Sequence, residues 1–174
     1  MDKGKKRILF DAETISARVK ELGKAISADY PQGNLVMVGL LKGSFIFLAD
    51  LVRTLEKPCQ IDFARISSYG SGTVSSGQLE VVMDIVPVTG RDVILVDDIV
   101  DSGLTLDYYR KRVEQFEPRS LKTAALIDKT GRRDRDVHLD YYGFRIEDGF
   151  VVGYGLDWDE RFRNLSHIYV LDES

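Results

Sequence analysis

The stretch that most constrains the fold is residues 93–106, where an aliphatic run leads into acidic and small polar residues and then into a helical pattern. Residues 93–96 are aliphatic and do not alternate with polar residues, which is typical of a strand covered on both faces. Asp97 and Asp98 follow this run, so we expect carboxylates at the carboxyl end of a buried strand. The order of strand, short loop and helix predicts an α/β fold with a mostly parallel, twisted sheet flanked by helices.

The loop at residues 101–105 has the features of an anion site. Gly103 lets the backbone approach a ligand closely, and the helix that starts here offers unpaired N–H groups and the positive end of its dipole. The neighbouring acids would repel an anion unless a cation intervenes or they contact hydroxyl groups, which indicates a sugar phosphate with a divalent metal. A capped surface turn is the alternative, but a cap needs one polar residue and not three acids.

The same order of elements occurs earlier in the chain. Residues 35–40 form a second apolar run and predict a buried strand, and Ser44 is expected to cap a following helix. Lys42 lies between them, at the strand end where open α/β sheets bind ligands. A solvated lysine is the alternative, but Gly43 and the helix start repeat the geometry of the first loop and favour a second anion site.

The remaining elements follow from hydrophobic spacing and turn residues. Asp11 is expected to cap a helix whose apolar face carries Ile15, Val19, Leu22 and Ile26. Further strands are expected, in chain order, at residues 61–66, 79–83, 121–127, 142–144, 150–154 and 167–171.

Residues 67–77 predict a flexible loop. Eight of these eleven residues are Ser or Gly, so the segment has too few apolar side chains to order itself. A mobile loop of this length in a compact domain is often a lid, and Tyr69 supplies an aromatic ring that can close over a ligand. An idle hairpin loop is the alternative.

Length and composition set the broad class. The 174 residues are expected to form one domain, residues 1–174, that buries roughly 70% of its unfolded surface. The net charge of −4 provides no general attraction to nucleic acid or to an anionic membrane. The single cysteine, Cys59, excludes an internal disulfide framework, and no apolar run approaches the ~20 residues that span a bilayer. We therefore expect a soluble, cytoplasmic protein.

Residues 97–105 resemble the signature with which type I phosphoribosyltransferases bind 5-phosphoribosyl 1-diphosphate, in the form found in hypoxanthine-guanine phosphoribosyltransferases. The similarity extends over nearly the whole chain, with the separate motifs in the family's order. It implies the type I phosphoribosyltransferase fold, with a small hood formed by terminal segments and a base-binding segment at residues 141–174. It also implies Mg²⁺ as cofactor and a homodimer or homotetramer.

The resemblance assigns roles to individual positions. The positions that match the phosphoribosyl site are Asp97, Asp98, Ser102, Gly103, Leu104 and Thr105. The positions that match the diphosphate site are Leu41, Lys42, Gly43, Ser68, Tyr69 and Arg163. The positions that match the purine site are Lys129, Phe150, Val151 and Asp157, and the implied magnesium ligands are Asp97, Asp98 and Asp157. Glu is common in the family where this chain has Asp97, so the reach of that carboxylate differs.

The implied reaction is a step of purine salvage, in which the 5-phosphoribosyl group moves from phosphoribosyl diphosphate to hypoxanthine or guanine and gives IMP or GMP plus diphosphate. Breaking the ribosyl bond builds positive charge on the sugar and negative charge on the leaving group, so carboxylates and cations are both needed. Asp101 matches the family's base, which accepts a proton at the purine N7. Lys129 matches the lysine that donates to the exocyclic oxygen, which favours 6-oxopurines over adenine.

Two other protein classes share parts of this pattern. Residues 94–98 also look like the acidic strand end of a signalling receiver domain, but too few residues follow Asp98 to complete that fold. An RNA-binding regulator related to the phosphoribosyltransferases would share the phosphate loop, but it would lack an acid at Asp101 and is expected to have a basic face.

Residues outside these motifs receive plainer predictions. Neither His138 nor His167 has a metal-like spacing to another ligand, so both are expected to be structural. Three arginines, Arg132, Arg133 and Arg135, are interpreted as a solvated loop, with a subunit contact as the alternative.

Overall fold

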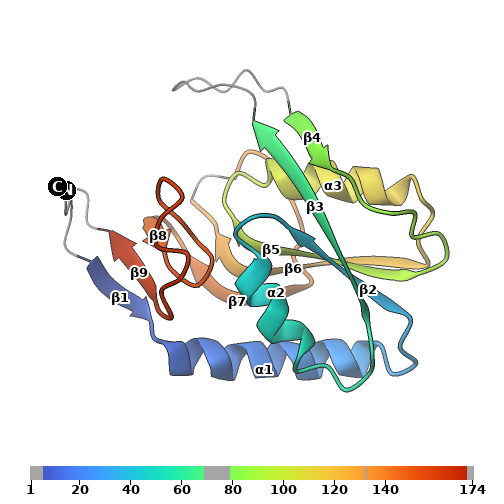
Figure 1. Cartoon of the computed structure of the whole chain (residues 1–174), viewed down its shortest axis with the longest axis horizontal. Coiled ribbons are helices and arrows are strands. Elements are labelled where there is room, and N and C mark those ends of the chain that lie inside the picture. Colours follow the sequence, from blue (N-terminus) through green and yellow to red (C-terminus); the bar gives the residue numbers. More distant parts are fainter. Residues whose placement is uncertain (1–5, 69–78, 132, 172–174) are drawn as a thin grey trace.

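The computed structural model of the chain describes residues 6–68, 79–131 and 133–171. Its largest element is a six-stranded sheet in the order β4-β3-β2-β5-β6-β7 (Figure 1). In chain order the strands are β2 (Leu35–Leu40), β3 (Gln60–Ser68), β4 (Leu79–Met83), β5 (Asp92–Val100), β6 (Ser120–Lys129) and β7 (Tyr141–Ile146). Neighbouring strands run parallel except β3 and β4, which run antiparallel. The predicted mostly parallel sheet is confirmed.

Helices cover both faces of this sheet because its central strands are apolar on both sides. All six residues of β2 and the first six of β5 are buried. One face packs against α1 (Ala12–Asp29) and α2 (Phe45–Val52), and the other packs against α3 (Leu104–Glu114), which lies across the sheet from α1 in Figure 1. Burial of these apolar surfaces is the main force that holds the layers together. None of the helices in the described part of the chain is long and apolar enough to cross a lipid bilayer.

The first helix forms as its sequence predicts. The Asp11 side chain caps α1 by accepting a hydrogen bond from the Thr14 N–H at 2.8 Å. The four apolar side chains expected on its inner face are all buried, namely Ile15, Val19, Leu22 and Ile26. Spacing of apolar residues by three and four positions therefore identified both the element and its packing face.

The two ends of the chain form a second, three-stranded antiparallel sheet in the order β1-β9-β8 (Figure 1). Its strands are β1 (Lys6–Phe10), β8 (Phe150–Val152) and β9 (Ile168–Leu171). His167 joins this sheet to α1 by accepting a hydrogen bond from the Ala12 N–H at 2.9 Å, which agrees with its expected structural role. The hood of terminal segments is confirmed, whereas β1 was not predicted.

The strand β5 continues further than its sequence predicts. Asp97 and Asp98 do not follow the strand but belong to it, and pairing with β6 extends to Val100. The prediction that the strand ends at the acids is wrong because β6 runs beside it and supplies backbone partners as far as Asp128. Lys129 is likewise the last residue of β6 and does not lie beyond its end.

Two boundary predictions also differ. Ser44 does not cap α2 with its side chain, because its hydroxyl donates a hydrogen bond back to the Leu40 carbonyl at 2.7 Å. The strand β3 extends through Ser68, which pairs with Leu79, so Ser67 and Ser68 belong to a strand and not to the expected loop. Tyr69 and the rest of the predicted lid, up to residue 77, lie outside the described residues.

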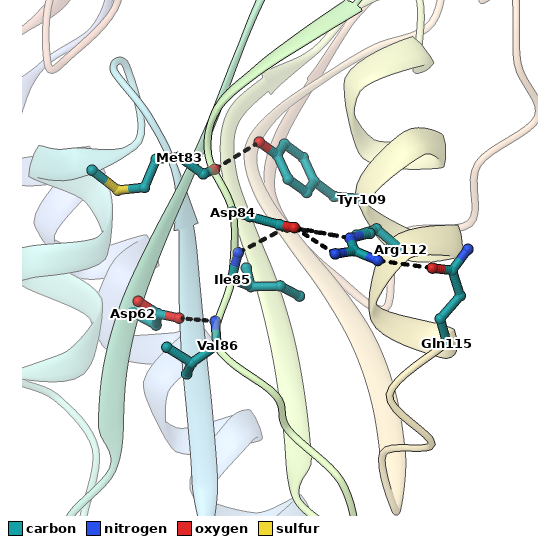
Figure 2. A network of polar contacts seen from close by, with 8 residues as sticks. All are labelled: Asp62, Met83, Asp84, Ile85, Val86, Tyr109, Arg112 and Gln115. Atoms are coloured by element: carbon teal, nitrogen blue, oxygen red, sulfur yellow. Dashed lines mark hydrogen bonds and ion pairs between the residues drawn. The ribbon is translucent and has the colours of Figure 1, made fainter.

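The segment that follows β4 forms polar contacts with α3 on one side and with β3 on the other (Figure 2). Arg112 of α3 donates to the Asp84 carboxylate from Nε at 3.1 Å and from a terminal nitrogen at 2.6 Å. The Val86 N–H donates to the Asp62 carboxylate of β3 at 3.0 Å. These contacts hold residues 84–86, which follow β4, against α3 and β3.

Candidate active site

The site lies at the edge of the sheet where the carboxyl ends of β2, β5 and β6 meet, as expected for an open α/β sheet. The loop after β5 encloses a cavity of about 130 Å³. Its lining comprises Asp97, Ile99, Val100, Asp101, Ser102, Gly103, Thr105 and Leu106. Five of these residues were predicted site residues, so the structure brings most of the phosphoribosyl signature around one cavity. Leu104, the first residue of α3, is exposed beside it.

The backbone of this loop is held in a fixed conformation. Gly103 has a φ of +84°, where a side chain is strained, and a Cβ there would lie 2.9 Å from the Arg135 carbonyl oxygen. The Ser102 carbonyl accepts hydrogen bonds from the backbone N–H groups of Asp134 and Arg135, both at 3.0 Å. The cavity therefore lies at the N-terminus of α3. The free backbone N–H groups and the dipole of a helix N-terminus favour a bound phosphate.

Asp97, which is buried, and Asp98, which is half-buried, form an acidic pair. Burial raises the pKa of Asp97 well above its ordinary value, and repulsion from Asp98 raises it further. Burial also raises the pKa of Asp98, while hydrogen bonds from Asp97 and from the backbone, and to a smaller extent the positive charge of Arg163, offset part of that rise. A divalent cation would relieve the repulsion within such a pair.

The donor set fits Mg²⁺ that is shared with a substrate. Mg²⁺ is commonly held by one or two carboxylates together with substrate phosphates and water. The described residues contain no group of three or more His, Cys, Asp or Glu side chains that could hold a metal ion by themselves. Asp97 and Asp98 would therefore supply part of the coordination, and substrate oxygens would supply the rest.

The loop after β2 reaches this acidic pair. The peptide bond between Leu41 and Lys42 is cis. A Cβ on Gly43 would lie 1.7 Å from the Asp98 carboxylate, and a Cβ on Gly155 would lie 2.1 Å from the Gly43 carbonyl oxygen. Because Gly43 has no side chain, the loop after β2 can lie directly against the Asp98 carboxylate. Because Gly155 has none, its segment can lie directly against the backbone of Gly43.

Arg163 completes this side of the site. It donates to the Gly155 carbonyl at 2.8 Å and forms an ion pair with Asp157 at 2.8 Å. The Glu160 carboxylate lies 3.4 Å from Arg163 and 3.0 Å from the Lys42 ammonium. The predicted residues Lys42, Arg163 and Asp157 therefore lie together, and Glu160 is an additional member that the sequence did not single out.

Lys129 and Asp101 meet at the other side of the cavity. The Lys129 side chain is only 8% exposed, and its ammonium lies 3.2 Å from Asp101 and 3.1 Å from Asp148. One Asp101 oxygen, Oδ1, is buried without a hydrogen-bond partner among the described residues. Asp148, in the turn between β7 and β8, was not predicted because nothing in its local sequence distinguishes it from an ordinary turn acid.

Phe150 and Val151 begin β8 of the hood and differ in exposure. Val151 is buried and pairs with Val170, whereas the Phe150 ring is 45% exposed. Phe150 contacts Trp158 edge to face, with 6.3 Å between ring centroids. An exposed ring on a well-supported strand can stack on a planar base. Trp158 was missed because its segment is otherwise polar.

The phosphoribosyl transferase domain family matches residues 7–159. Curated relatives include the hypoxanthine-guanine phosphoribosyltransferase of Aquifex aeolicus (strain VF5), which is 45% identical over 98% of both chains. The enzyme of the same name from Bacillus subtilis (strain 168) is 42% identical over 95% of this chain and 92% of its own. This chain belongs to the hypoxanthine-guanine phosphoribosyltransferase family.

Solved structures agree with this membership. A crystal structure of a hypoxanthine phosphoribosyltransferase from Staphylococcus aureus superposes with a TM-score of 0.90 at 38% identity and covers 95% of this chain and 91% of the other. A ternary substrates complex of a mutant hypoxanthine phosphoribosyltransferase from Trypanosoma cruzi gives a TM-score of 0.90 at 40% identity, with 99% and 97% covered. The predicted type I phosphoribosyltransferase fold is confirmed, and a receiver domain is excluded.

One expectation outside the family motifs is wrong. Arg133 is not a solvated loop residue, because it forms an ion pair with Asp128, which also pairs with Arg145 at 2.9 Å. The Asp128 side chain is buried, and a buried carboxylate needs cationic partners. Arg135 is exposed as predicted, and Arg132 lies outside the described residues.

Proposed function

We propose that the protein transfers the 5-phosphoribosyl group from phosphoribosyl diphosphate to a 6-oxopurine, hypoxanthine or guanine, with Mg²⁺, and so forms IMP or GMP plus diphosphate. The observation that carries this proposal is the contact between Asp101 and Lys129 at 3.2 Å. Asp101 lines the phosphate-loop cavity, whereas Lys129 ends the neighbouring strand beside the hood. The pair therefore joins a sugar phosphate site to a base site. The names of the relatives describe the same activity.

The sugar phosphate and diphosphate would be held by opposite ends of the site. Residues 102–105 at the start of α3 would bind the 5′-phosphate through backbone N–H groups and hydroxyls. Asp97 and Asp98 would contact the ribose hydroxyls and Mg²⁺, with Asp157 as the further metal ligand. Lys42, Arg163 and the backbone at Gly43 would bind the diphosphate, since the ion pairs with Glu160 and Asp157 bring these two cations to one place.

The base would lie between Lys129 and the hood. A lysine ammonium only donates hydrogen bonds, so Lys129 favours the 6-oxo group over the amino group of adenine. The exposed Phe150 ring would stack on the purine, and the backbone of Val151 would read its edge. Asp157 begins the segment that carries Trp158, the aromatic neighbour of Phe150.

In the proposed reaction, a purine nitrogen forms a bond to the sugar carbon C1 as the bond from C1 to the diphosphate oxygen breaks. Asp101 accepts the proton from N7, and its carboxylate lies 3.2 Å from the Lys129 ammonium. When bound, Mg²⁺ would supply neutralisation of the charge that develops on the leaving diphosphate. Lys42 and Arg163 would stabilise the same charge.

The test is a panel of bases incubated with the protein, Mg²⁺ and phosphoribosyl diphosphate, with nucleotide formation followed by chromatography. We expect turnover of hypoxanthine, guanine or both, and none of adenine. Turnover of adenine alone would contradict the role of Lys129. Retention of RNA at moderate salt without turnover of any base would favour the RNA-binding alternative.

We also propose that the protein forms a homodimer or homotetramer. Exposed large apolar side chains gather along β3, β4 and the segment after β4, namely Ile61, Val81, Val82, Met83 and Val86. An edge strand with exposed apolar side chains is a typical site of subunit contact. Assembly through it would place the β3–β4 hairpins of two copies next to each other.

A further inference from the structure

Glu160 lies on the two cations that the proposed function assigns to the diphosphate. Its Oε2 atom is 3.0 Å from the Lys42 ammonium and 3.4 Å from the Arg163 guanidinium. A single protein oxygen therefore occupies the place between these cations where an anionic ligand oxygen would bind.

The backbone directs Glu160 to this position. Asp159, Glu160 and Phe162 have φ values of +53°, +59° and +74°, which non-glycine residues rarely adopt. The Glu160 N–H donates to the Asp157 carboxylate at 2.8 Å, and Trp158 and Arg161 exchange backbone hydrogen bonds at 3.1 and 3.2 Å. This tight turn carries the Glu160 side chain toward Lys42 at a cost in backbone strain, which is a feature of functional segments.

We propose that Glu160 is an internal competitor of the diphosphate. Its carboxylate pairs with Lys42 and Arg163 while the diphosphate position is empty, and diphosphate binding displaces it. The exchange weakens diphosphate binding, because two ion pairs must be broken for each diphosphate bound. It also speeds product release, because the carboxylate returns to the cations as diphosphate leaves.

Asp157 has a different part in the same cluster. Its carboxylate pairs with Arg163 at 2.8 Å and accepts a hydrogen bond from the Glu160 backbone. Asp157 therefore orients Arg163 and the turn, whereas Glu160 bridges both cations. Removing the charge of Glu160 frees Lys42 for the ligand and leaves Arg163 with Asp157 as its one remaining acidic partner among the described residues.

This inference rests on the proposed function, and a binding measurement separates the two. The dissociation constant of inorganic diphosphate with Mg²⁺ is measured by calorimetry for the full chain and for Glu160→Gln, together with the inhibition constant of diphosphate in the forward reaction. We expect Glu160→Gln to bind diphosphate about threefold more tightly or better, with the inhibition constant lowered in parallel. Glu160→Asp shortens the side chain and should give an intermediate affinity.

The matched control is Glu56→Gln, which removes the same charge from an exposed residue beyond the opposite end of α2 from Lys42. It should leave diphosphate affinity unchanged. An affinity of Glu160→Gln that is equal to or weaker than that of the native chain would overturn the inference, and so would an equal gain in the control. Failure of the native chain to bind diphosphate at all would instead overturn the proposed function.

Discussion

Asp101 occupies the position at which the two halves of the site meet, so its replacement tests the proposed chemistry at the scale of one residue. Asp101→Asn keeps the shape of the side chain but removes the proton acceptor. We expect turnover to fall by about 10²- to 10⁴-fold, because that is the usual contribution of a general base. The dissociation constant of phosphoribosyl diphosphate should change little, since we propose that the backbone of residues 102–105 holds the 5′-phosphate.

Stopped assays of nucleotide formation and equilibrium binding of phosphoribosyl diphosphate separate these effects. Asp136→Asn is a suitable control, because Asp136 is an exposed acid outside the cavity. Turnover of Asp101→Asn at the native rate would remove Asp101 from the role of base.

Gly43 permits the close approach of the β2 loop to Asp98, so a single methyl group should disturb the site. In Gly43→Ala the added carbon would lie 1.7 Å from the Asp98 carboxylate, and either the loop or the acid must move. We expect the KM for phosphoribosyl diphosphate to rise by at least about tenfold with little loss of stability. Gly23→Ala is the matched control, since its methyl group would meet Thr54 at 1.8 Å, between α1 and the end of α2. It should lower the melting temperature and leave KM unchanged, and a reversal of these two effects would contradict the assignment.

At the residue scale, the sequence predicted candidate site residues from recognisable motifs, and the structure brings Asp101, Gly103 and Lys129 to one edge of the sheet. It missed Glu160 and Asp148, because each becomes part of the site only through a tertiary contact with a lysine distant in sequence. The segment around Glu160 contains several acids and arginines, and no local spacing distinguishes the one that reaches Lys42.

At the scale of elements, apolar patterns predicted the buried strands and α1, whereas boundaries and exposed strands were harder to predict. β5 runs past its acids because β6 continues beside it, which is a tertiary effect. β1 begins with Lys6 and Arg7, is largely exposed, and forms by pairing with β9 from the other end of the chain. Neither feature has a local sequence signal, since both depend on a strand supplied by a different part of the chain.

The start of β5 is anchored by Asp92, and its carboxylate predicts how stability depends on pH. Asp92 is buried, accepts a hydrogen bond from the Ser120 hydroxyl at 2.7 Å and pairs with Arg119. The bond from Arg119 holds the pKa of Asp92 below its ordinary value of 3.8. A carboxyl group whose pKa is lower in the folded state than in the unfolded state stabilises the fold at pH values above its unfolded-state pKa. This stabilisation is lost as the pH falls through the pKa of the folded state.

We therefore expect Asp92→Asn to lower the free energy of unfolding by about 1–3 kcal/mol at pH 7, because Arg119 loses its partner. The difference from the native chain should shrink as the pH falls below 3.8. Urea unfolding at pH 7 and at pH 3 measures both values, with Glu56→Gln as a control for loss of an exposed charge. A deficit that stays constant across this pH range would contradict the assignment.

At the scale of the whole molecule, the described elements leave exposed apolar side chains along β3 and β4, the surface that we propose as the subunit interface. Val82→Asp places a charge in this surface, where Val82 is 51% exposed. If this surface is the subunit interface, the variant should shift toward monomer in light scattering after gel filtration, because a desolvated charge destabilises an interface. Ile8→Asp, at an exposed position of β1 in the hood, should keep the native assembly. An unchanged mass for Val82→Asp would place the interface elsewhere.

We propose that one edge of the sheet joins a sugar phosphate site to a 6-oxopurine site for group transfer. The most direct measurement incubates the native chain with Mg²⁺, phosphoribosyl diphosphate and hypoxanthine, and quantifies nucleotide and diphosphate in the same samples. Both products should form in equal amounts and only when the base is present. Release of diphosphate without nucleotide, or no reaction of hypoxanthine or guanine, would contradict this proposal.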